Sequence, residues 1–271
     1  MPRSAILLAV LLTATAVRAE PPKGYRLVWE DNFDGDQLDK AKWTPETYVR
    51  RGNPLSADAV TVKGGVLTIT TYTEGGKHYT GFITTKGKFE TTHGYFEARI
   101  RFNSSPGQWG AFWLHSPTIG KPVGDPAKAG TEIDIVEHRA RDSKGKDVSD
   151  LLAMNLHWDG YKPKVHQHAG QSTTAPAGAA SLRGHWHTYG LLWTAEGYTF
   201  SLDGVEQWKT DKAVSKRSEF LLLTCEIEDK GWAGDIPAGG YGPRGESKTT
   251  MEVNWVRVWQ TVTPGKGGTG N

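Results

Sequence analysis

The stretch 94–102 reads GYFEARIRF, and its residues divide between two faces of an extended chain. From Phe96 onward every second residue is apolar, and a glutamate and two arginines stand between them. A period of two predicts a half-buried β-strand that turns its apolar face towards a core. Segments 60–70, 198–202 and 251–260 are likewise rich in strand-forming residues.

Helical patterns are scarce in the rest of the chain. No long segment repeats apolar residues at the spacing of an amphipathic helix, and only 211–219 could hold a short one. Many strands with frequent turn signals predict an all-β fold, an antiparallel sandwich or barrel. The 271 residues suit a single domain, because all-β sandwiches of this length are often undivided.

Composition narrows the classes of partner. The formal net charge of +2 excludes a strong electrostatic case for nucleic acid or an anionic membrane as partner. Eleven tryptophans stand beside nine tyrosines and eight phenylalanines. The flat indole face suits a protein core, and it also suits stacking against a sugar ring.

The two ends of the chain differ from its middle. Arg3 precedes an apolar run at 5–17, and small residues follow, so 1–19 is predicted to be a signal peptide cleaved before Glu20. An uncleaved anchor is the alternative, but the run is short for a membrane span. We therefore expect a secreted or periplasmic protein with one sandwich domain at 20–262. The Gly- and Pro-containing stretch 263–271 is predicted to be a flexible tail.

Cysteine and histidine give little support for a thiol or zinc site. The only cysteine, Cys225, follows three leucines and a threonine, a context typical of a buried strand rather than of a catalytic thiol. One cysteine also excludes an internal disulfide framework. Histidine pairs at 166 and 168 and at 185 and 187 lack the further ligands that would complete a zinc site.

The segment 130–138 reads GTEIDIVEH and carries three acidic residues. On a regular strand Glu132 and Asp134 would share a face, and Glu137 would point to the opposite one. An extra residue near 135–136, forming a β-bulge, would return Glu137 to the face of the other two. We expect a bulge here, because it would gather three carboxyl groups on one side and leave the aliphatic residues in the core.

This spacing suits glycoside hydrolysis. With the bulge, the Cα atoms of Glu132 and Glu137 lie roughly 13 Å apart, at about 3.3 Å per strand step. Side chains leaning together would leave roughly 5 Å between the carboxyl groups, a separation typical of a retaining mechanism. Glu132 would be the nucleophile, Glu137 the general acid/base, and Asp134 would share a proton with Glu132. The alternative is a solvated acidic strand edge.

The acidic segment resembles the active-site signature of glycoside hydrolase family 16, in the bulge-containing form of laminarinases, agarases and their relatives. The resemblance extends over most of the chain, and further matching segments are 27–33, 38–43, 84–99, 108–114, 187–194 and 253–258. It implies a jelly-roll sandwich of the concanavalin A type, with an open polysaccharide cleft on its concave sheet. It also implies retaining hydrolysis.

The resemblance assigns the three acidic residues the roles given above and adds others. It places a histidine near the central aspartate, which matches His157, although a purely structural histidine is the alternative. It places tryptophans against the sugar, which matches Trp109 and Trp113, with a core role as the alternative. Trp232 stands in a glycine-rich loop with little core to join, and we expect it to stack on substrate.

One departure from the family concerns metal. Relatives often hold a structural calcium with carboxylates near the first strand and in the last one. This chain has Asn32 and Asn254 at the matching positions, and two lost charges weaken a site for a hard cation. We therefore expect no obligatory metal or other cofactor.

These patterns together predict a secreted, retaining endo-glycosidase that cuts β-1,3- or mixed β-1,3-1,4-glucan and acts as a monomer on polysaccharide. A galactanase for agar- or carrageenan-type polymers is the first alternative, because the cationic run at 139, 141, 144 and 146 would suit sulfated sugars. Transglycosylation and a non-catalytic carbohydrate-binding sandwich are the others, and the three carboxyl groups argue against the last.

Overall fold

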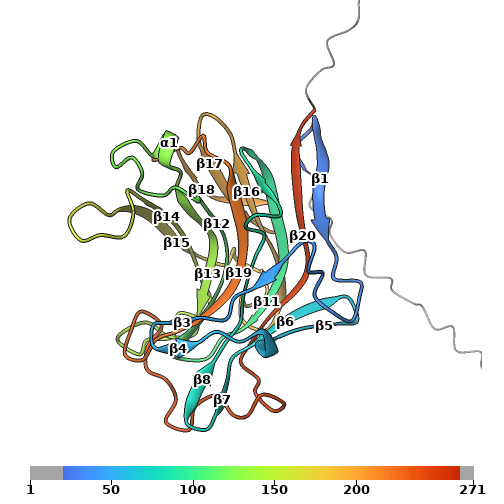
Figure 1. Cartoon of the computed structure of the whole chain (residues 1–271), viewed down its shortest axis with the longest axis vertical. Helices are drawn as coiled ribbons and strands as arrows, with labels where there is room; N and C mark the ends of the chain where they lie inside the picture. The colour runs from blue at the N-terminus through green and yellow to red at the C-terminus, as the bar shows by residue number, and fades with distance from the viewer. Residues whose placement is uncertain (1–20, 263–271) are drawn as a thin grey trace, which may run out of the picture.

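The computed structural model describes residues 21–262, which form two large antiparallel β-sheets packed against each other (Figure 1). The predicted all-β sandwich is therefore confirmed. The predicted signal peptide at 1–19 and tail at 263–271 lie outside the described residues.

The first sheet has eight strands and contains the strand expected from the alternation at 94–102. Its order is β18 (Val205–Thr210), β17 (Tyr198–Leu202), β16 (Trp186–Trp193), β11 (Gly94–Asn103), β20 (Thr250–Thr261), β6 (Val66–Thr70) and β5 (Val60–Lys63), and β1 (Tyr25–Asp31) also pairs with β20.

The second sheet also has eight strands and contains the acidic segment near its middle. Its order is β15 (Gln167–Thr174), β14 (Leu151–Trp158), β13 (Glu132–Arg139), β12 (Gln108–His115), β19 (Glu219–Ile227), β9 (Phe82–Thr84) and β2 (Thr44–Pro45), and β10 (Glu90–Thr91) also pairs with β19.

Two small hairpins and two short helical turns complete the described chain. They are β3 (Val49–Arg50) with β4 (Asn53–Pro54), β7 (Tyr72–Glu74) with β8 (Lys77–Tyr79), the 3-10 turn η1 (Ala57–Ala59) and α1 (Pro126–Ala129). Within 21–262 no helix has the length and apolar character that crossing a membrane requires.

The core lies between the two sheets. Phe96, Ile100 and Phe102 of β11 are fully buried, as the alternation predicts, and they belong to one cluster with Phe112 of β12 and Leu223 of β19. Each core strand therefore directs alternate side chains inward. The intervening side chains of the second sheet point to its outer face, where they are free to build a site.

Segment 60–70 is a hairpin of β5 and β6 rather than one continuous strand. Gly64 and Gly65 form its turn with φ angles of +59° and +76°, a backbone conformation that side chains disfavour and glycine adopts readily. The two glycines were the signal for this turn within an otherwise strand-like composition.

Segment 211–219 forms no helix, although it was the one place where the sequence allowed one. Its residues form a loop that leads into β19. Trp193 donates its indole N–H to the carbonyl of Ser215 at 3.1 Å, and Tyr198 donates its hydroxyl to the carbonyl of Ala213 at 3.2 Å. These tertiary hydrogen bonds use backbone carbonyls that a helix would need for itself.

Candidate active site

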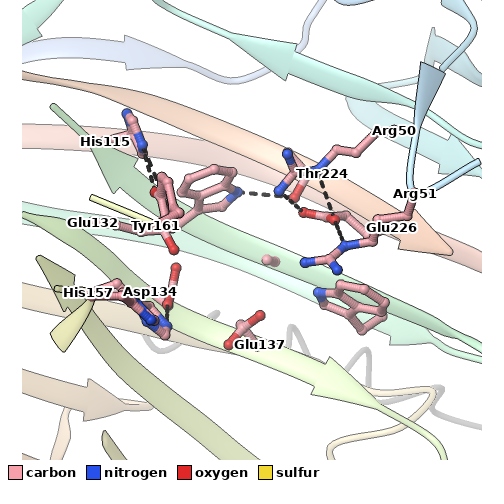
Figure 2. Close-up of a pocket in the computed structure, with 14 residues that line it drawn as sticks. Arg50, Arg51, His115, Glu132, Asp134, Glu137, His157, Tyr161, Thr224 and Glu226 are labelled. Carbon is pink, nitrogen blue, oxygen red and sulfur yellow. Dashed lines mark hydrogen bonds and ion pairs between the residues drawn. The ribbon is translucent and has the colours of Figure 1, made fainter. Parts of the chain in front are cut away.

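A cleft of about 540 Å³ lies on the outer face of the second sheet (Figure 2). Strands β12, β13 and β19 supply its floor, and the β3 hairpin and the loop 159–166 supply parts of its wall. The residues that line it are Arg50, Arg51, Trp109, Ala111, Trp113, His115, Glu132, Asp134, Glu137, His157, Tyr161, His166, Thr224 and Glu226. The cleft thus contains six of the seven predicted site residues.

The predicted β-bulge is present in β13. Asp134 pairs with Asn155 of β14 and Glu137 pairs with Ala153, so that three steps along β13 match two along β14. Ile135 and Val136 are 2% and 1% exposed and both join the core. The extra residue lets two consecutive aliphatic side chains turn inward, and as a result Glu137 emerges into the cleft beside the other two acids.

Glu132 lies under the loop 159–166 and is half-buried. The hydroxyl of Tyr161 donates a hydrogen bond to its Oε2 atom, and Nε2 of His115 lies 3.6 Å from the same oxygen. Burial raises the pKa of Glu132 to about 7, and the Tyr161 hydrogen bond opposes this rise. Burial thus works against the ionised form of this carboxyl group, and the Tyr161 hydrogen bond works in favour of it.

Asp134 is the most deeply buried of the three acids, at 4% exposed. Its Oδ2 atom lies 3.5 Å from Nε2 of His157, and Nδ1 of His157 lies 3.0 Å from Nε2 of His166. Burial raises the pKa of Asp134, and the neighbouring carboxylates raise it further. Burial lowers the pKa of His157 to about 4, so this imidazole is neutral at neutral pH.

Glu137 has an amide as its partner. Nδ2 of Asn155 donates to Oε2 of Glu137 at 2.6 Å. Burial raises the pKa of Glu137 to about 7, and the hydrogen bond from Asn155 opposes the rise. Gly170 of β15 lies beside this amide, and a Cβ atom there would overlap Oδ1 of Asn155. Glycine at 170 therefore leaves the space in which Asn155 reaches Glu137.

A fourth acid, Glu226 of β19, faces the others across the cleft. Arg50 donates to its Oε1 atom at 2.9 Å, and Arg51 donates to its Oε2 atom at 2.8 Å. Arg51 also reaches Glu228 at 3.2 Å. The two guanidinium groups are thus matched by carboxylates, and they add little net positive charge to the cleft.

Sequence reasoning missed several residues of this cleft. Glu226 could have been found, because it alternates with Cys225 and Ile227 on a strand whose other face is core. Arg50 and Arg51 come from a short hairpin, and Tyr161 from an irregular loop. Neither segment has a periodicity that would have assigned a direction to its side chains.

The two tryptophans of β12 line the cleft but are mostly covered by their neighbours. Trp109 is 5% exposed and Trp113 is 7% exposed. Trp113 donates its indole N–H to Thr224 at 3.0 Å and packs edge-on against Phe82, with ring centres 5.9 Å apart. Both tryptophans therefore form fixed walls of the cleft, and each combines a packing role with a surface that faces the cavity.

Trp232 lies outside the main cleft and lines an adjoining cavity of about 430 Å³ together with Glu137 and Arg139. Its ring meets Trp109 edge-on at 5.7 Å between ring centres. The guanidinium carbon of Arg139 lies 3.7 Å from the ring centre of Trp232, and the same side chain donates to the Trp232 carbonyl. One face of this indole is therefore covered by an arginine.

The two asparagines at the expected calcium positions already have arginine partners. Arg257 donates to Oδ1 of Asn32, and Arg99 donates to Oδ1 of Asn254, each at 3.1 Å. Each amide oxygen thus faces a cation, an arrangement that does not fit calcium.

A set of possible metal donors lies in the cleft itself, where Glu132, Asp134 and His157 each bring one atom within 4.8 Å of the others. These atoms belong to the hydrogen-bonded cluster described above, and we assign them no metal. Burial raises the pKa of the Cys225 thiol to about 12, so this cysteine remains a protonated core residue.

Comparison with known proteins matches residues 28–261 to the family model described as "Beta-porphyranase A-D, GH16 domain". "Beta-glucanase" of Rhodothermus marinus is 30% identical over 97% of this chain and 96% of its own length. "Glucan endo-1,3-beta-glucosidase A1" of Niallia circulans is 24% identical over 88% of this chain, which spans only 38% of that relative.

Among solved structures, porphyranase B from Zobellia galactanivorans superimposes with a TM-score of 0.71 at 23% identity, over 88% of this chain and 94% of its own. This likeness concerns the fold. The family match extends from β1 to the end of β20 and includes the bulged strand. The bulge that gathers the acidic residues agrees with this match. Because the family model covers residues 28–261, the chain belongs to glycoside hydrolase family 16.

Proposed function

We propose that this glycoside hydrolase cuts internal β-linkages of a polysaccharide with retention of configuration. The observation that carries the proposal is the bulge in β13, because it places Glu132 and Glu137 on one side of the same cleft. Glu132 acts as the nucleophile and Glu137 as the general acid and base. Two carboxyl groups on one strand face are the minimum that a retaining mechanism needs.

The first half of the reaction forms a glycosyl-enzyme. Glu137 donates its proton to the glycosidic oxygen while Glu132 attacks the anomeric carbon, and the chain beyond the cut leaves as an alcohol. Burial of Glu137 supports this role, because it raises the pKa of the carboxyl group and so favours the protonated form that a general acid needs. Asn155 fixes the orientation of Glu137.

The second half returns the enzyme to its starting state. Glu137, now ionised, takes a proton from water as that water attacks the anomeric carbon, and Glu132 leaves as a carboxylate. A second sugar could replace the water, which would give transglycosylation. Asp134 with neutral His157 forms a proton-holding pair beside the nucleophile. Burial raises the pKa of Asp134, which supports a shared proton with Glu132.

The shape of the cleft supports cutting within a chain rather than at its end. The main cavity and the adjoining one share Arg51, Trp109, Glu137 and His157, so the hollow continues along the sheet past the acids. Trp109 and Trp113 line the main cavity, and Trp232 lines its continuation, which supports substrate-binding roles for all three.

The substrate that we propose first is a neutral β-1,3- or mixed β-1,3-1,4-glucan. The name of the Rhodothermus marinus relative supports a β-glucan. The cleft also supports a neutral sugar, because Arg50 and Arg51 are matched by Glu226 and Glu228. A neutral polymer has no charged group that would need to separate these pairs.

A second candidate is a β-galactan of the agar and carrageenan type, and the family match favours it, since that description names β-porphyranases. Arg139 lies in the adjoining cavity and could face a sulfate group there. The rest of the predicted cationic run supports it less, because Arg141 already pairs with Asp147 at 2.7 Å.

Three further features of the protein are also proposals. We propose export to the periplasm or outside the cell, supported by the apolar run at 5–17. We propose a monomer, since a cleft built from one chain needs no second copy. We propose that no calcium is required, supported by the arginines that hold Asn32 and Asn254.

The first prediction concerns substrate and stereochemistry. Laminarin and lichenan should be cut into short oligosaccharides, and proton NMR of the earliest products should show the β-anomer before mutarotation, because two displacements restore the configuration. Cellulose, agarose and porphyran complete the panel. Cleavage of porphyran or agarose alone would favour the second candidate, early α-anomer would exclude retention, and binding without cleavage would indicate a non-catalytic module.

The second prediction concerns the acids. Glu132→Gln should abolish turnover on every polymer that the wild type cuts while keeping the wild-type melting temperature, because an amide cannot form the glycosyl-enzyme. Glu137→Ala should be slow, and added azide should partly restore it on activated glycosides. Glu206→Gln, an exposed residue on β18, is the matched control and should be fully active. Near-native kcat for Glu132→Gln would refute the nucleophile assignment.

The third prediction separates the tryptophans. Trp232→Ala should weaken polysaccharide binding by about 1 to 3 kcal/mol and raise KM with little loss of stability, because the ring lies at the cleft margin. Trp109→Ala should lower kcat and also cost about 3 to 5 kcal/mol of unfolding free energy, since that ring is mostly buried. Titration calorimetry measures the binding free energy, and urea unfolding measures the free energy of unfolding.

The control for the tryptophans is Trp186→Ala, on the outer face of the other sheet, which should leave substrate affinity unchanged. If Trp232→Ala lowers stability and leaves affinity unchanged, this residue belongs to the fold and not to the binding site.

The fourth prediction concerns calcium. The melting temperature should be the same in EDTA and in excess calcium chloride, because the candidate amide oxygens already accept hydrogen bonds from arginines. Magnesium chloride at equal ionic strength is the control. A melting temperature that rises with calcium concentration would show a site that binds the folded state and would contradict the proposal.

A further inference from the structure

Tyr161 occupies an unusual place over the cleft. It belongs to the loop 159–166, the residue as a whole is 54% exposed, and its hydroxyl donates a hydrogen bond to Oε2 of Glu132. Figure 2 shows Tyr161 beside Glu132, with His115 above them. The hydroxyl of a half-exposed tyrosine can form hydrogen bonds with water, so folding does not require its hydrogen bond to Glu132. This hydrogen bond therefore belongs to the site and not to the core.

The direction of the hydrogen bonds follows from the chemistry of the three groups. A carboxylate accepts, so the phenol of Tyr161 donates its only hydrogen to Glu132. Nε2 of His115 lies 2.8 Å from the same phenol oxygen, and it donates to that oxygen in the tautomer that carries its hydrogen on Nε2. Burial lowers the pKa of His115 to about 4, so this ring is neutral and carries one N–H.

His115 is held in this orientation by its neighbours. Its ring stacks on Tyr161 at an interplanar angle of 15°, and it meets Trp113 edge-on at 5.7 Å between ring centres. Phe220 packs against it at 5.5 Å. The side chain of His115, which contacts the phenol of Tyr161 above Glu132, is thus a packed imidazole rather than a mobile surface side chain.

The loop is placed by close backbone contact with a second loop. The amide of Gly124 donates to Oδ1 of Asp159 at 2.8 Å. Gly120 lies against Gly160, and a Cβ atom on Gly120 would come within 2.7 Å of the Gly160 nitrogen. Asp159 itself takes a φ of +64°, a conformation that costs free energy in a residue with a side chain. The fold therefore fixes the backbone that carries Tyr161.

The hydrogen bond engages one of the two carboxyl oxygens of Glu132. Both Tyr161 and His115 approach Oε2, which leaves Oε1 as the oxygen that can attack an anomeric carbon. A donor to an ionised carboxyl group also favours its charged form. The other titratable groups that face or surround Glu132 are Asp134 and Glu137 of β13, His157 of β14, Glu219 and Glu226 of β19, Arg50 of β3 and His166 of the loop.

Most of these surrounding groups oppose ionisation of Glu132. Glu137 and Glu226 repel its negative charge, and burial acts in the same direction, whereas Arg50 and Tyr161 favour the charged form. Arg50 is already paired with Glu226, so part of the positive charge of Arg50 is balanced by that carboxylate rather than by Glu132. Among the described residues that contact the carboxyl group directly, Tyr161 is thus the chief support of the ionised state.

We propose that Tyr161 is a positioning residue that keeps Glu132 ionised and aims its free oxygen at the sugar. The inference rests on the proposed role of Glu132 as the nucleophile. Tyr161 takes no part in bond making itself, and it acts through the carboxyl group that it contacts.

Tyr161→Phe tests this, because it removes the hydroxyl and keeps the ring. Loss of a hydrogen bond to a charged group should lower kcat/KM about 10- to 100-fold at neutral pH. The pKa of Glu132 should rise, so the acidic limb of the kcat/KM profile should move to higher pH by about one unit. Tyr79→Phe on β8 is the matched control, since its ring stacks on Tyr72 outside the cleft.

Gly120→Ala is a second test, which keeps Tyr161 itself unchanged and moves the loop that carries it. The added methyl group must push the loop 159–166 away, so this variant should show the same direction of change in kcat/KM and in the acidic limb. Melting temperatures of both variants identify any that fail to fold.

A measurement without substrate separates this inference from the proposed function. Titration of glutamate side chains by carbon NMR, with Glu132→Gln to assign the signal, gives the pKa of Glu132 directly. A higher pKa in Tyr161→Phe supports the positioning role even if no tested polymer is cut. A pKa within error of wild type, or a raised KM with an unchanged acidic limb, would show that Tyr161 only contacts sugar or loop and would overturn the inference.

Discussion

The β-bulge in β13 is the constraint on which the rest of the site depends. A strand at the boundary of a sandwich must give every second side chain to the core, and this rule alone would bury Glu137 among apolar residues. Ile135 and Val136 both enter the core, and this double insertion reverses the alternation. The same local distortion thus completes the packing on one face and assembles the acids on the other.

The acids that share the cleft differ mainly in their partners. A phenol contacts Glu132, an imidazole lies beside Asp134, an amide contacts Glu137, and two arginines hold Glu226. The partners of Glu226 are cations, whereas the partners of the other three acids are neutral. The partners therefore distinguish Glu226, a structural carboxylate held by arginines, from Glu132, Asp134 and Glu137, which could exchange protons during a reaction.

The parts of the molecule that were predictable from sequence are the strands, in which side chains alternate between two faces with a period of two residues. Alternation at 94–102 predicted β11, and the spacing of acids in 132–137 predicted the bulge, because each pattern repeats a geometric rule of strands. Arg50 and Tyr161 could not be placed in this way. They come from a short hairpin and a loop, whose directions are fixed by contacts with distant segments such as the glycine at 120.

This division between strands and loops explains how one chain can resemble enzymes named for different polymers. The acids that we propose as the reacting groups stand on β13 and are set by the bulge, a feature of the backbone that does not depend on which sugar lies above it. The β3 hairpin, the loop 159–166 and the loop that carries Trp232 reach the cleft from outside the strands of this sheet. Their side chains can change without disturbing the core, because none of them belongs to the main apolar cluster. Substrate choice can therefore vary through these segments while the bulged strand and its chemistry stay constant.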